Sequence, residues 1–316
     1  MKFAFAILAF PVCLYNNFFA QTPHVDSIAQ MIKNAKNDTV LVKAYNDLAE
    51  ELYISNPDSV MSISGIVYSI CEEHLKTAKN NERYFYLKQQ AQAANNYAVI
   101  MDDQTDTKNS IEWHKKSLAL SRQIDDKKQI ASSLNNLGYA YKQLGYYSEA
   151  LDYYQQSLDV KKQINDSAGI ANTLNNMGIM LENNGEYEKA LENYLHYLAM
   201  STSLKNKKSI AVATNNIAGI YKIQKKYGQA LELYLKCVTI HQELNSKRGL
   251  AQGYNNIGNV YSLMDSIQKT LYYYEKGLEY AQQAKDNSLI SVCMNNAGSC
   301  YAKMKDYAKG EKYCLK

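Results

Sequence analysis

The dipeptide Asn-Asn returns every 40 residues through most of this chain. A repeat of this length is one supersecondary unit that cannot bury its apolar face alone, so the units must stack on their neighbours. The period therefore predicts one elongated array instead of the two globular domains that 316 residues would otherwise suggest. Six pairs share the period, each followed by an apolar residue and then Gly or Ala: Asn95-Asn96, Asn135-Asn136, Asn175-Asn176, Asn215-Asn216, Asn255-Asn256 and Asn295-Asn296.

The repeating unit is predicted to be a pair of helices. Between residues 58 and 316 there is no proline, and Ala, Leu, Lys, Glu and Gln are abundant, which favours helix throughout. Apolar residues follow a three-to-four spacing over 131–144 and again over 148–164, and Gly145 separates the two stretches. Each unit is thus predicted to be a helix, a tight turn and a second helix.

Small and aromatic residues recur at fixed offsets within the unit. The pattern Leu134-x2-Leu137-Gly138-x2-Tyr141, followed by Ala150-x3-Tyr154, resembles the tetratricopeptide repeat. The resemblance implies an all-α fold, a right-handed superhelical solenoid of antiparallel helix pairs, in which Gly138 and Ala150 let two helices touch and the Tyr154 ring fills the next interval. Corresponding residues in later units are Met177, Gly178, Ala190 and Tyr194; Ile217, Ala218, Tyr221, Ala230 and Tyr234; Ile257, Gly258, Tyr261 and Tyr274; and Ala297, Gly298 and Tyr301.

The period departs from the common form of that family, which is roughly 34 residues long. A 40-residue period implies longer helices or loops, as in the branch seen in kinesin light chains. The resemblance divides the chain into divergent helical hairpins over 41–130 and a regular array over 131–316, whose last unit is expected to be truncated. The first hairpin, at 41–76, is offset by about ten extra residues from the strict register.

The N-terminus has the layout of a secretory signal peptide. Lys2 precedes an apolar stretch from Phe3 to Tyr15, and Gln21 begins the polar sequence that follows. We expect residues 1–20 to be cleaved near Ala20, leaving a lead segment at 21–40. An uncleaved membrane anchor is the alternative.

Several classes of chemistry find no support in the sequence. The net charge of +4 comes without a long basic run, so no nucleic-acid partner is expected; three basic pairs are placed in loops between units, at 127–128, 207–208 and 247–248. No Gly-rich phosphate loop or catalytic motif is present, so we expect no catalytic residues and no cofactor. Five cysteines remain after a cleaved signal, at unrelated spacings, which implies neither a disulfide framework nor a metal site.

The asparagine pairs break a local rule, because Asn costs up to about 0.7 kcal/mol relative to Ala inside a helix. The family resemblance implies that the first helix of each unit lines a concave groove, and that an asparagine before the Leu-Gly pair binds the backbone of an extended peptide. The alternative is that the amides bond neighbouring helices of the scaffold. The predicted peptide-binding residues are Asn96, Asn135, Asn136, Asn175, Asn176, Asn215, Asn216, Asn255, Asn256, Asn295 and Asn296.

These observations predict a scaffold that binds a peptide or protein segment and is not itself an enzyme. An exported array of this kind also resembles the sensory region of bacterial membrane signalling proteins, which would place it in the periplasm, free or membrane-anchored. Membrane contact would come only through an uncleaved signal or a span beyond Lys316. Two alternatives remain: a free periplasmic adaptor without signalling output, and the accessory repeat domain of an enzyme whose catalytic domain follows Lys316.

Overall fold

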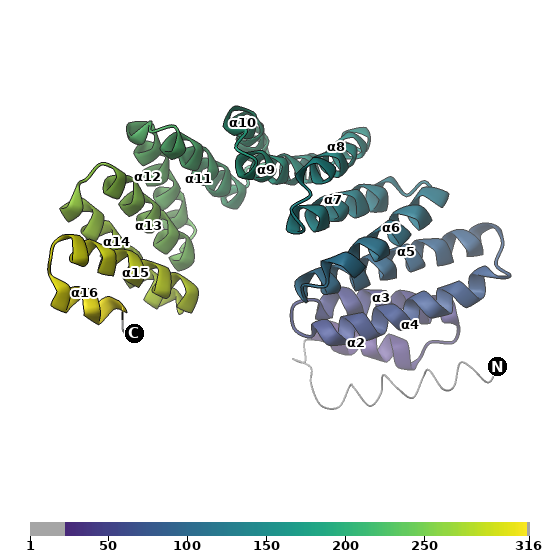
Figure 1. Cartoon of the computed structure of the whole chain (residues 1–316). Coiled ribbons are helices and arrows are strands. Elements are labelled where there is room, and N and C mark those ends of the chain that lie inside the picture. Colours follow the sequence, from purple (N-terminus) through teal and green to yellow (C-terminus); the bar gives the residue numbers. More distant parts are fainter. Residues whose placement is uncertain (1–22, 315–316) are drawn as a thin grey trace. The chain divides into compact units, whose positions relative to one another are not determined.

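The computed structural model describes residues 23–314, except for the side chains of residues 312 and 314. All regular elements of this part are α-helices, which confirms the predicted all-α class (Figure 1). The helices fall into two compact units that divide between Asp166 and Ser167. Unit 1 contains α2 (Pro23–Lys33), α3 (Asp38–Leu52), α4 (Pro57–Leu75), α5 (Asn80–Asp103), α6 (Thr107–Gln123), α7 (Lys127–Gln143) and α8 (Tyr147–Gln163). Unit 2 contains α9 (Ser167–Asn183), α10 (Tyr187–Ser203), α11 (Lys207–Ile223), α12 (Tyr227–Glu243), α13 (Lys247–Leu263), α14 (Ile267–Ala284), α15 (Asn287–Lys303) and α16 (Tyr307–Cys314).

Within each unit, helices that follow one another in the chain pack together as hairpins. We call the first helix of each repeat an A helix and the second a B helix. The A helices are α3, α5 and α7 in unit 1, and α9, α11, α13 and α15 in unit 2. Neighbouring A helices also touch, for example α3 with α5 and α13 with α15. The asparagine pairs lie at these contacts between A helices.

The 40-residue period consists of two 20-residue halves. Helices of 17 residues such as α7 and α8 alternate with turns of three residues, so the extra length lies in the helices and not in the loops. One residue of each turn is left-handed: Gly145 and Gly185 have φ of 79°, and Lys225, Asp265 and Lys305 take the same place with φ of 59°, 53° and 61°. These residues end the helix because the Schellman bonds that they close require a positive φ.

The A helices begin earlier than the apolar pattern suggests. The Asp126 side chain accepts a hydrogen bond from the Gln129 backbone and caps α7 at Lys127, four residues before the predicted start at 131. Asn206 and Ser246 cap α11 and α13 in the same way. The three basic pairs therefore form the first turns of α7, α11 and α13, and their assignment to loops was wrong. The capping side chain sets the start of the helix even though the solvated first turn has too few apolar residues for the apolar pattern to reveal it.

The hairpin interior packs glycine directly against a tyrosine ring, whereas the prediction placed Gly138 opposite Ala150 and Tyr154 in the next interval. A Cβ added at Gly138 would lie 2.8 Å from the Tyr154 ring, and one added at Gly178 would lie 2.5 Å from the Tyr194 ring. Both rings are fully buried. Only glycine allows the ring of the B helix to approach the A helix so closely.

The N-terminal part of unit 1 departs most from the regular pattern. The lead segment contains the helix α2, which the sequence pattern did not indicate, and its Val25 and Ile28 are buried against the α3–α4 hairpin. The predicted signal peptide at 1–20 lies outside the described residues and stays a prediction. None of the described helices has the length and apolar character to cross a membrane.

Candidate functional site

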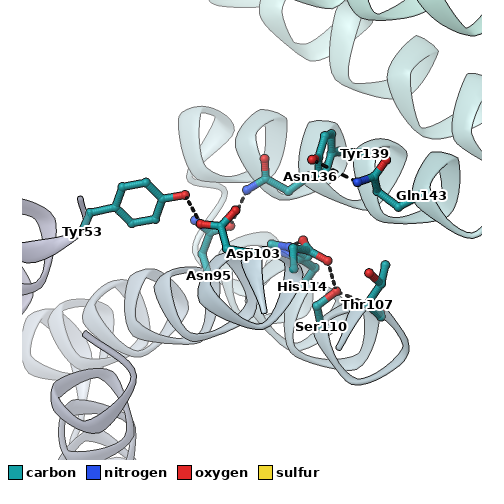
Figure 2. A network of polar contacts seen from close by, with 10 residues as sticks. Tyr53, Asn95, Asp103, Thr107, Ser110, His114, Asn136, Tyr139 and Gln143 are labelled. Carbon is teal, nitrogen blue, oxygen red and sulfur yellow. Dashed lines mark hydrogen bonds and ion pairs between the residues drawn. The ribbon is translucent and has the colours of Figure 1, made fainter. Parts of the chain in front are cut away.

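Within each unit, side-chain hydrogen bonds join asparagine pairs on neighbouring A helices. In the contacts α5–α7, α9–α11, α11–α13 and α13–α15, the second asparagine of one repeat donates a side-chain N–H to the side-chain oxygen of the first asparagine of the repeat before it. We call this row the asparagine ladder. Its bonds are Asn136 to Asn95 at 2.9 Å (Figure 2), Asn216 to Asn175 at 3.0 Å, Asn256 to Asn215 at 2.9 Å and Asn296 to Asn255 at 2.8 Å.

The ladder explains why the chain tolerates two adjacent asparagines inside the A helices other than α3. Each bond is worth about 1 kcal/mol net, which offsets most of the helix-propensity cost of a pair. The scaffold role that the sequence left as an alternative is therefore present in the structure. Whether the same amides also contact a peptide stays a prediction.

The ladder leaves hydrogen-bonding capacity on the second asparagine of each pair. A carboxamide has two N–H donors and an oxygen with two lone pairs. Asn136 and Asn256 each use one N–H in the ladder, so one N–H and the oxygen remain. The second asparagines are half-buried, so these remaining groups are within reach of a ligand.

The regular ladder changes at the first and last pairs. The Asn96 side-chain nitrogen is buried without a partner, because Asn46 on α3 donates instead to the Gln89 backbone and side-chain oxygens, at 3.2 and 2.9 Å. The ten extra residues in the first repeat place Asn46 beside Gln89 and not beside Asn96. Asn295, the first asparagine of the pair on α15, is exposed.

The A-helix ends of unit 1 carry a polar network (Figure 2). The Tyr53 hydroxyl donates to the Asp103 carboxylate at 2.9 Å, and Gln143 donates to the Tyr139 hydroxyl at 3.2 Å. Burial and the bond to Asp103 raise the pKa of Tyr53 to about 12, so its hydroxyl stays a donor. Lys142 lies over the Tyr139 ring, 4.4 Å from its centroid. The sequence pattern did not single out Tyr53 or Asp103.

Beneath this network lies a buried cluster with a serine, an aspartate and a histidine. The Asp102 carboxylate accepts from the Ser110 hydroxyl and lies 3.1 Å from His114 Nε2. Ser110 also donates to the Thr107 backbone oxygen, and both Ser110 and His114 are fully buried. A nucleophilic serine needs the histidine as its base, with the aspartate behind the histidine. Here the aspartate stands between them, so the cluster is a packing network.

Unit 2 presents a different face on its A helices. Four residues of α11 at helical spacing, Val212, Asn216, Gly219 and Ile223, form one stripe, and Val212 and Ile223 are exposed. Exposed apolar side chains continue at the equivalent places, Leu263 on α13 and Val292 on α15. The asparagine ladder of unit 2 is thus flanked by exposed apolar side chains.

The hydroxyls of the buried tyrosines meet side chains of this face. Tyr194 donates to Glu182 at 2.7 Å, and Tyr274 donates to Asn259 at 2.8 Å. Burial is the main cause that raises the pKa of Tyr274 to about 12. These partners could not be recognised from the sequence alone, because they lie 12 and 15 residues apart on different helices of a hairpin.

The described cysteines are packing residues. Cys71, Cys237 and Cys293 are buried, and burial raises the thiol pKa of Cys237 and Cys293 to about 11. No group of three metal-ligating side chains occurs within residues 23–314. The described part of the chain therefore offers neither an activated thiol nor a metal centre.

Comparison with known proteins supports the repeat assignment. The family model described as "Tetratricopeptide repeat" matches residues 89–163 and 169–243. No curated protein matches the sequence.

Three solved structures illustrate the likeness of fold. Aspartyl phosphate phosphatase F from Bacillus subtilis is 15% identical, with a TM-score of 0.68, 99% of this chain covered and 90% of that chain. The apo form of the quorum sensor NprR from B. thuringiensis is 12% identical, with a TM-score of 0.62 and coverages of 91% and 89%. A Rap protein complexed with Competence and Sporulation Factor is 12% identical, with a TM-score of 0.56 and coverages of 87% and 96%.

These similarities extend to nearly the full length of each neighbour, but at such low identity they concern the fold. The neighbours are arrays of helical hairpins, and two matched segments of this chain carry the repeat signature itself. The regular hairpins, the glycine–tyrosine packing and the family match together identify residues 89–163 and 169–243 as tetratricopeptide repeats.

Proposed function

We propose that this protein binds an extended polypeptide segment along the A-helix face that carries the asparagine ladder. The observation that carries the proposal is the unused capacity of the ladder: Asn136 in unit 1 and Asn256 in unit 2 each keep an N–H donor and an acceptor oxygen. A polypeptide backbone offers a matching acceptor and donor at every residue. The quorum sensor NprR and a Rap protein complexed with Competence and Sporulation Factor, both of similar fold, support a protein or peptide partner.

We further propose that the chain is the extracytoplasmic sensory part of a bacterial signalling protein and has no catalytic activity of its own. The apolar stretch from Phe3 to Tyr15 supports export. N-terminal sequencing of the exported protein should find a chain that begins after about Ala20. A chain that begins at Met1 and stays with the membrane would point to an anchor, and one that stays inside the cell would contradict export.

The binding proposal can be tested with paired variants that break the same ladder bond. Asn95→Ala and Asn136→Ala remove the acceptor and the donor of one bond, and Asn175→Ala and Asn216→Ala do the same in unit 2. The two variants that break the same ladder bond should lose similar free energies of unfolding. The proposal places the ligand on the second asparagine of each bond, so Asn136→Ala and Asn216→Ala should weaken binding further, by about 0.5–1.5 kcal/mol for each bond lost.

The probe is a set of peptides selected from a phage-displayed random dodecapeptide library on the immobilised full chain. Their affinity for each variant is measured by fluorescence anisotropy, and the stability of each variant by hydrogen exchange. Equal loss of affinity in both members of each pair would make the asparagines scaffold residues only. Failure of the library to yield any binding peptide would contradict the proposed function.

A further inference from the structure

Gly219 is unlike the glycines that pack against tyrosine rings. A Cβ added at Gly219 would meet only the Tyr234 hydroxyl at 3.8 Å and a Glu182 carboxylate oxygen at 4.0 Å, which are ordinary contact distances. By contrast, a Cβ at Gly178 or Gly258 would collide with a tyrosine ring, at 2.5 or 2.6 Å. Glycine inside a helix costs about 1 kcal/mol relative to alanine. Packing therefore does not account for Gly219, although the helix is weakened by it.

The absence of a side chain at Gly219 leaves the Tyr234 hydroxyl without a partner. The tyrosines at the same place in the two adjacent repeats donate to Glu182 and to Asn259. Asn259 occupies in its repeat the position of Gly219. Tyr234 is 2% exposed, and no hydrogen bond to its hydroxyl occurs among the described residues.

The electrostatic surroundings keep the Tyr234 hydroxyl protonated. Burial and the nearby Glu182 carboxylate raise its pKa well above the ordinary value, so it is an O–H donor that lacks an acceptor. The Tyr234 side chain is buried, and its hydroxyl lies 3.8 Å from the position that a Cβ at the half-buried Gly219 would take, so a ligand group would reach it over that glycine.

Glu182 supplies the complementary acceptor. One of its oxygens accepts from Tyr194, and the other faces the space above Gly219. Lys222 lies one repeat along at the position equivalent to Glu182, and no ion pair between the two is found within residues 23–314. We call the space bounded by Glu182, Gly219 and Tyr234 the Gly219 notch. It holds one donor and one acceptor.

We propose that the Gly219 notch receives a carboxamide group of the bound polypeptide, which is an inference that rests on the proposed function. The carbonyl oxygen of the carboxamide accepts from Tyr234 and its N–H donates to Glu182. An ammonium or guanidinium group would pair with Glu182 but would leave the Tyr234 O–H without an acceptor. The exposed Val212 and Ile223 on the same stripe of α11 then contact apolar side chains on either side of the amide.

The next repeat shows that such a group fits. There the Asn259 carboxamide accepts from Tyr274 at 2.8 Å, as the ligand carboxamide would accept from Tyr234. A side-chain carboxamide introduced into the chain can therefore compete with the carboxamide of the ligand for the notch. The substitution Gly219→Asn should place a carboxamide in the notch and exclude the one from the ligand.

The test measures the affinity of the library-selected dodecapeptides for wild type and three variants. Gly219→Asn should weaken binding by at least about tenfold through lost hydrogen bonds and steric exclusion, and Tyr234→Phe by about threefold to tenfold. Gly228→Ala is the matched control, because Gly228 is an exposed glycine of α12 with nothing within 4 Å of an added Cβ, and it should bind as wild type does. Gly219→Asn should also keep or raise the midpoint of urea unfolding.

Each result decides between distinct claims. Selected peptides that bind Gly219→Asn as tightly as wild type would overturn the notch and leave the proposed function standing. A Gly219→Asn chain that loses helicity would also overturn it, because the notch must have room for that side chain. If no peptide is selected, both claims fail. Replacing Asn and Gln of a binding peptide by Ala shows which kind of amide occupies the notch. If it is a side-chain amide, Tyr234→Phe should no longer weaken binding of the Ala peptide. If it is a backbone amide, Tyr234→Phe should weaken binding of the Ala peptide as before.

Discussion

Unit 1 and unit 2 use the same hairpin but fill it with different chemistry. In unit 2 the buried position of the B helix holds Tyr194, whose hydroxyl bonds Glu182 at the half-buried A-helix face. The α7–α8 hairpin of unit 1 holds Tyr154 at this place, but in its α5–α6 hairpin the equivalent residue is His114, which lies against the buried Asp102 together with Ser110. The same place in the repeat is thus a tyrosine ring in the regular hairpins and a closed polar cluster in the α5–α6 hairpin of unit 1.

This difference shows that the helix pattern and the interior chemistry are separable. A helix of 17 residues forms in both units because the turns and caps recur every 20 residues. The interior of each hairpin then needs only matched volume and satisfied polar groups. In unit 1, the Asp102 carboxylate pairs with Ser110 and His114 inside the hairpin, and unit 2 has no such cluster at this place among its described residues.

The largest effect is expected in the polar cluster of unit 1. His114→Ala leaves the buried Asp102 carboxylate without its closest nitrogen donor and creates a cavity, so it should cost about 3 kcal/mol. Hydrogen exchange of amides in α5 and α6 measures this, because stability in a repeat array is local. A cost below about 1 kcal/mol would mean that the cluster is solvated, and that the two units differ less than their geometry indicates.

The glycine–tyrosine contact of unit 2 should give the next largest effect. In Gly178→Ala the new Cβ would lie 2.5 Å from the Tyr194 ring, so the expected net loss is about 1–2 kcal/mol after the gain in helix propensity. Ala218 already stands opposite Tyr234 at the equivalent place. Ala218→Gly is therefore the reverse control and should not stabilise its hairpin. If Gly178→Ala leaves the stability unchanged, the Tyr194 ring moves aside at little cost, and the close glycine–tyrosine contact is not needed for the hairpin.

Two tyrosine hydroxyls of unit 2 should differ although their rings are equally buried. Tyr274→Phe removes a bond to Asn259 and should cost about 1 kcal/mol. Tyr234→Phe removes an unpaired hydroxyl and should change stability by less than about 0.5 kcal/mol. The measurement is the protection of amides in α12 and α14. Equal costs would show that Tyr234 has a partner after all.

The smallest effect concerns the turns. Lys225 holds the left-handed place that Gly145 and Gly185 hold elsewhere, so Lys225→Gly should stabilise the α11–α12 turn by about 0.5 kcal/mol. Gly145→Ala should destabilise the α7–α8 turn by a similar or larger amount. Local hydrogen exchange checks both. A loss of stability in Lys225→Gly would show that the lysine side chain contributes to the turn.

The sequence predicted most of the scaffold, because period, apolar spacing and small-residue positions all report on backbone packing. The family resemblance carried by their offsets implied packing roles for Gly138 and Tyr154, although not the direct contact between them. The ladder could be stated only as an alternative, since its bonds join residues 41 positions apart whose contact depends on repeat stacking. The sequence could not predict a binding role for Gly219, because that role depends on the Tyr234 hydroxyl, which only the structure places beside this glycine.

The central claim is that the second asparagines of unit 2 face a bound polypeptide while the ladder stays intact. The most direct measurement is the NMR spectrum of the side-chain amides in the full chain, with and without a saturating selected peptide. The amide resonances of Asn216 and Asn256 should shift, and that of the half-buried Asn193 on the B helix α10, which donates to the Lys189 backbone, should not. A peptide that shifts Asn193 and leaves Asn216 and Asn256 unchanged would contradict the account.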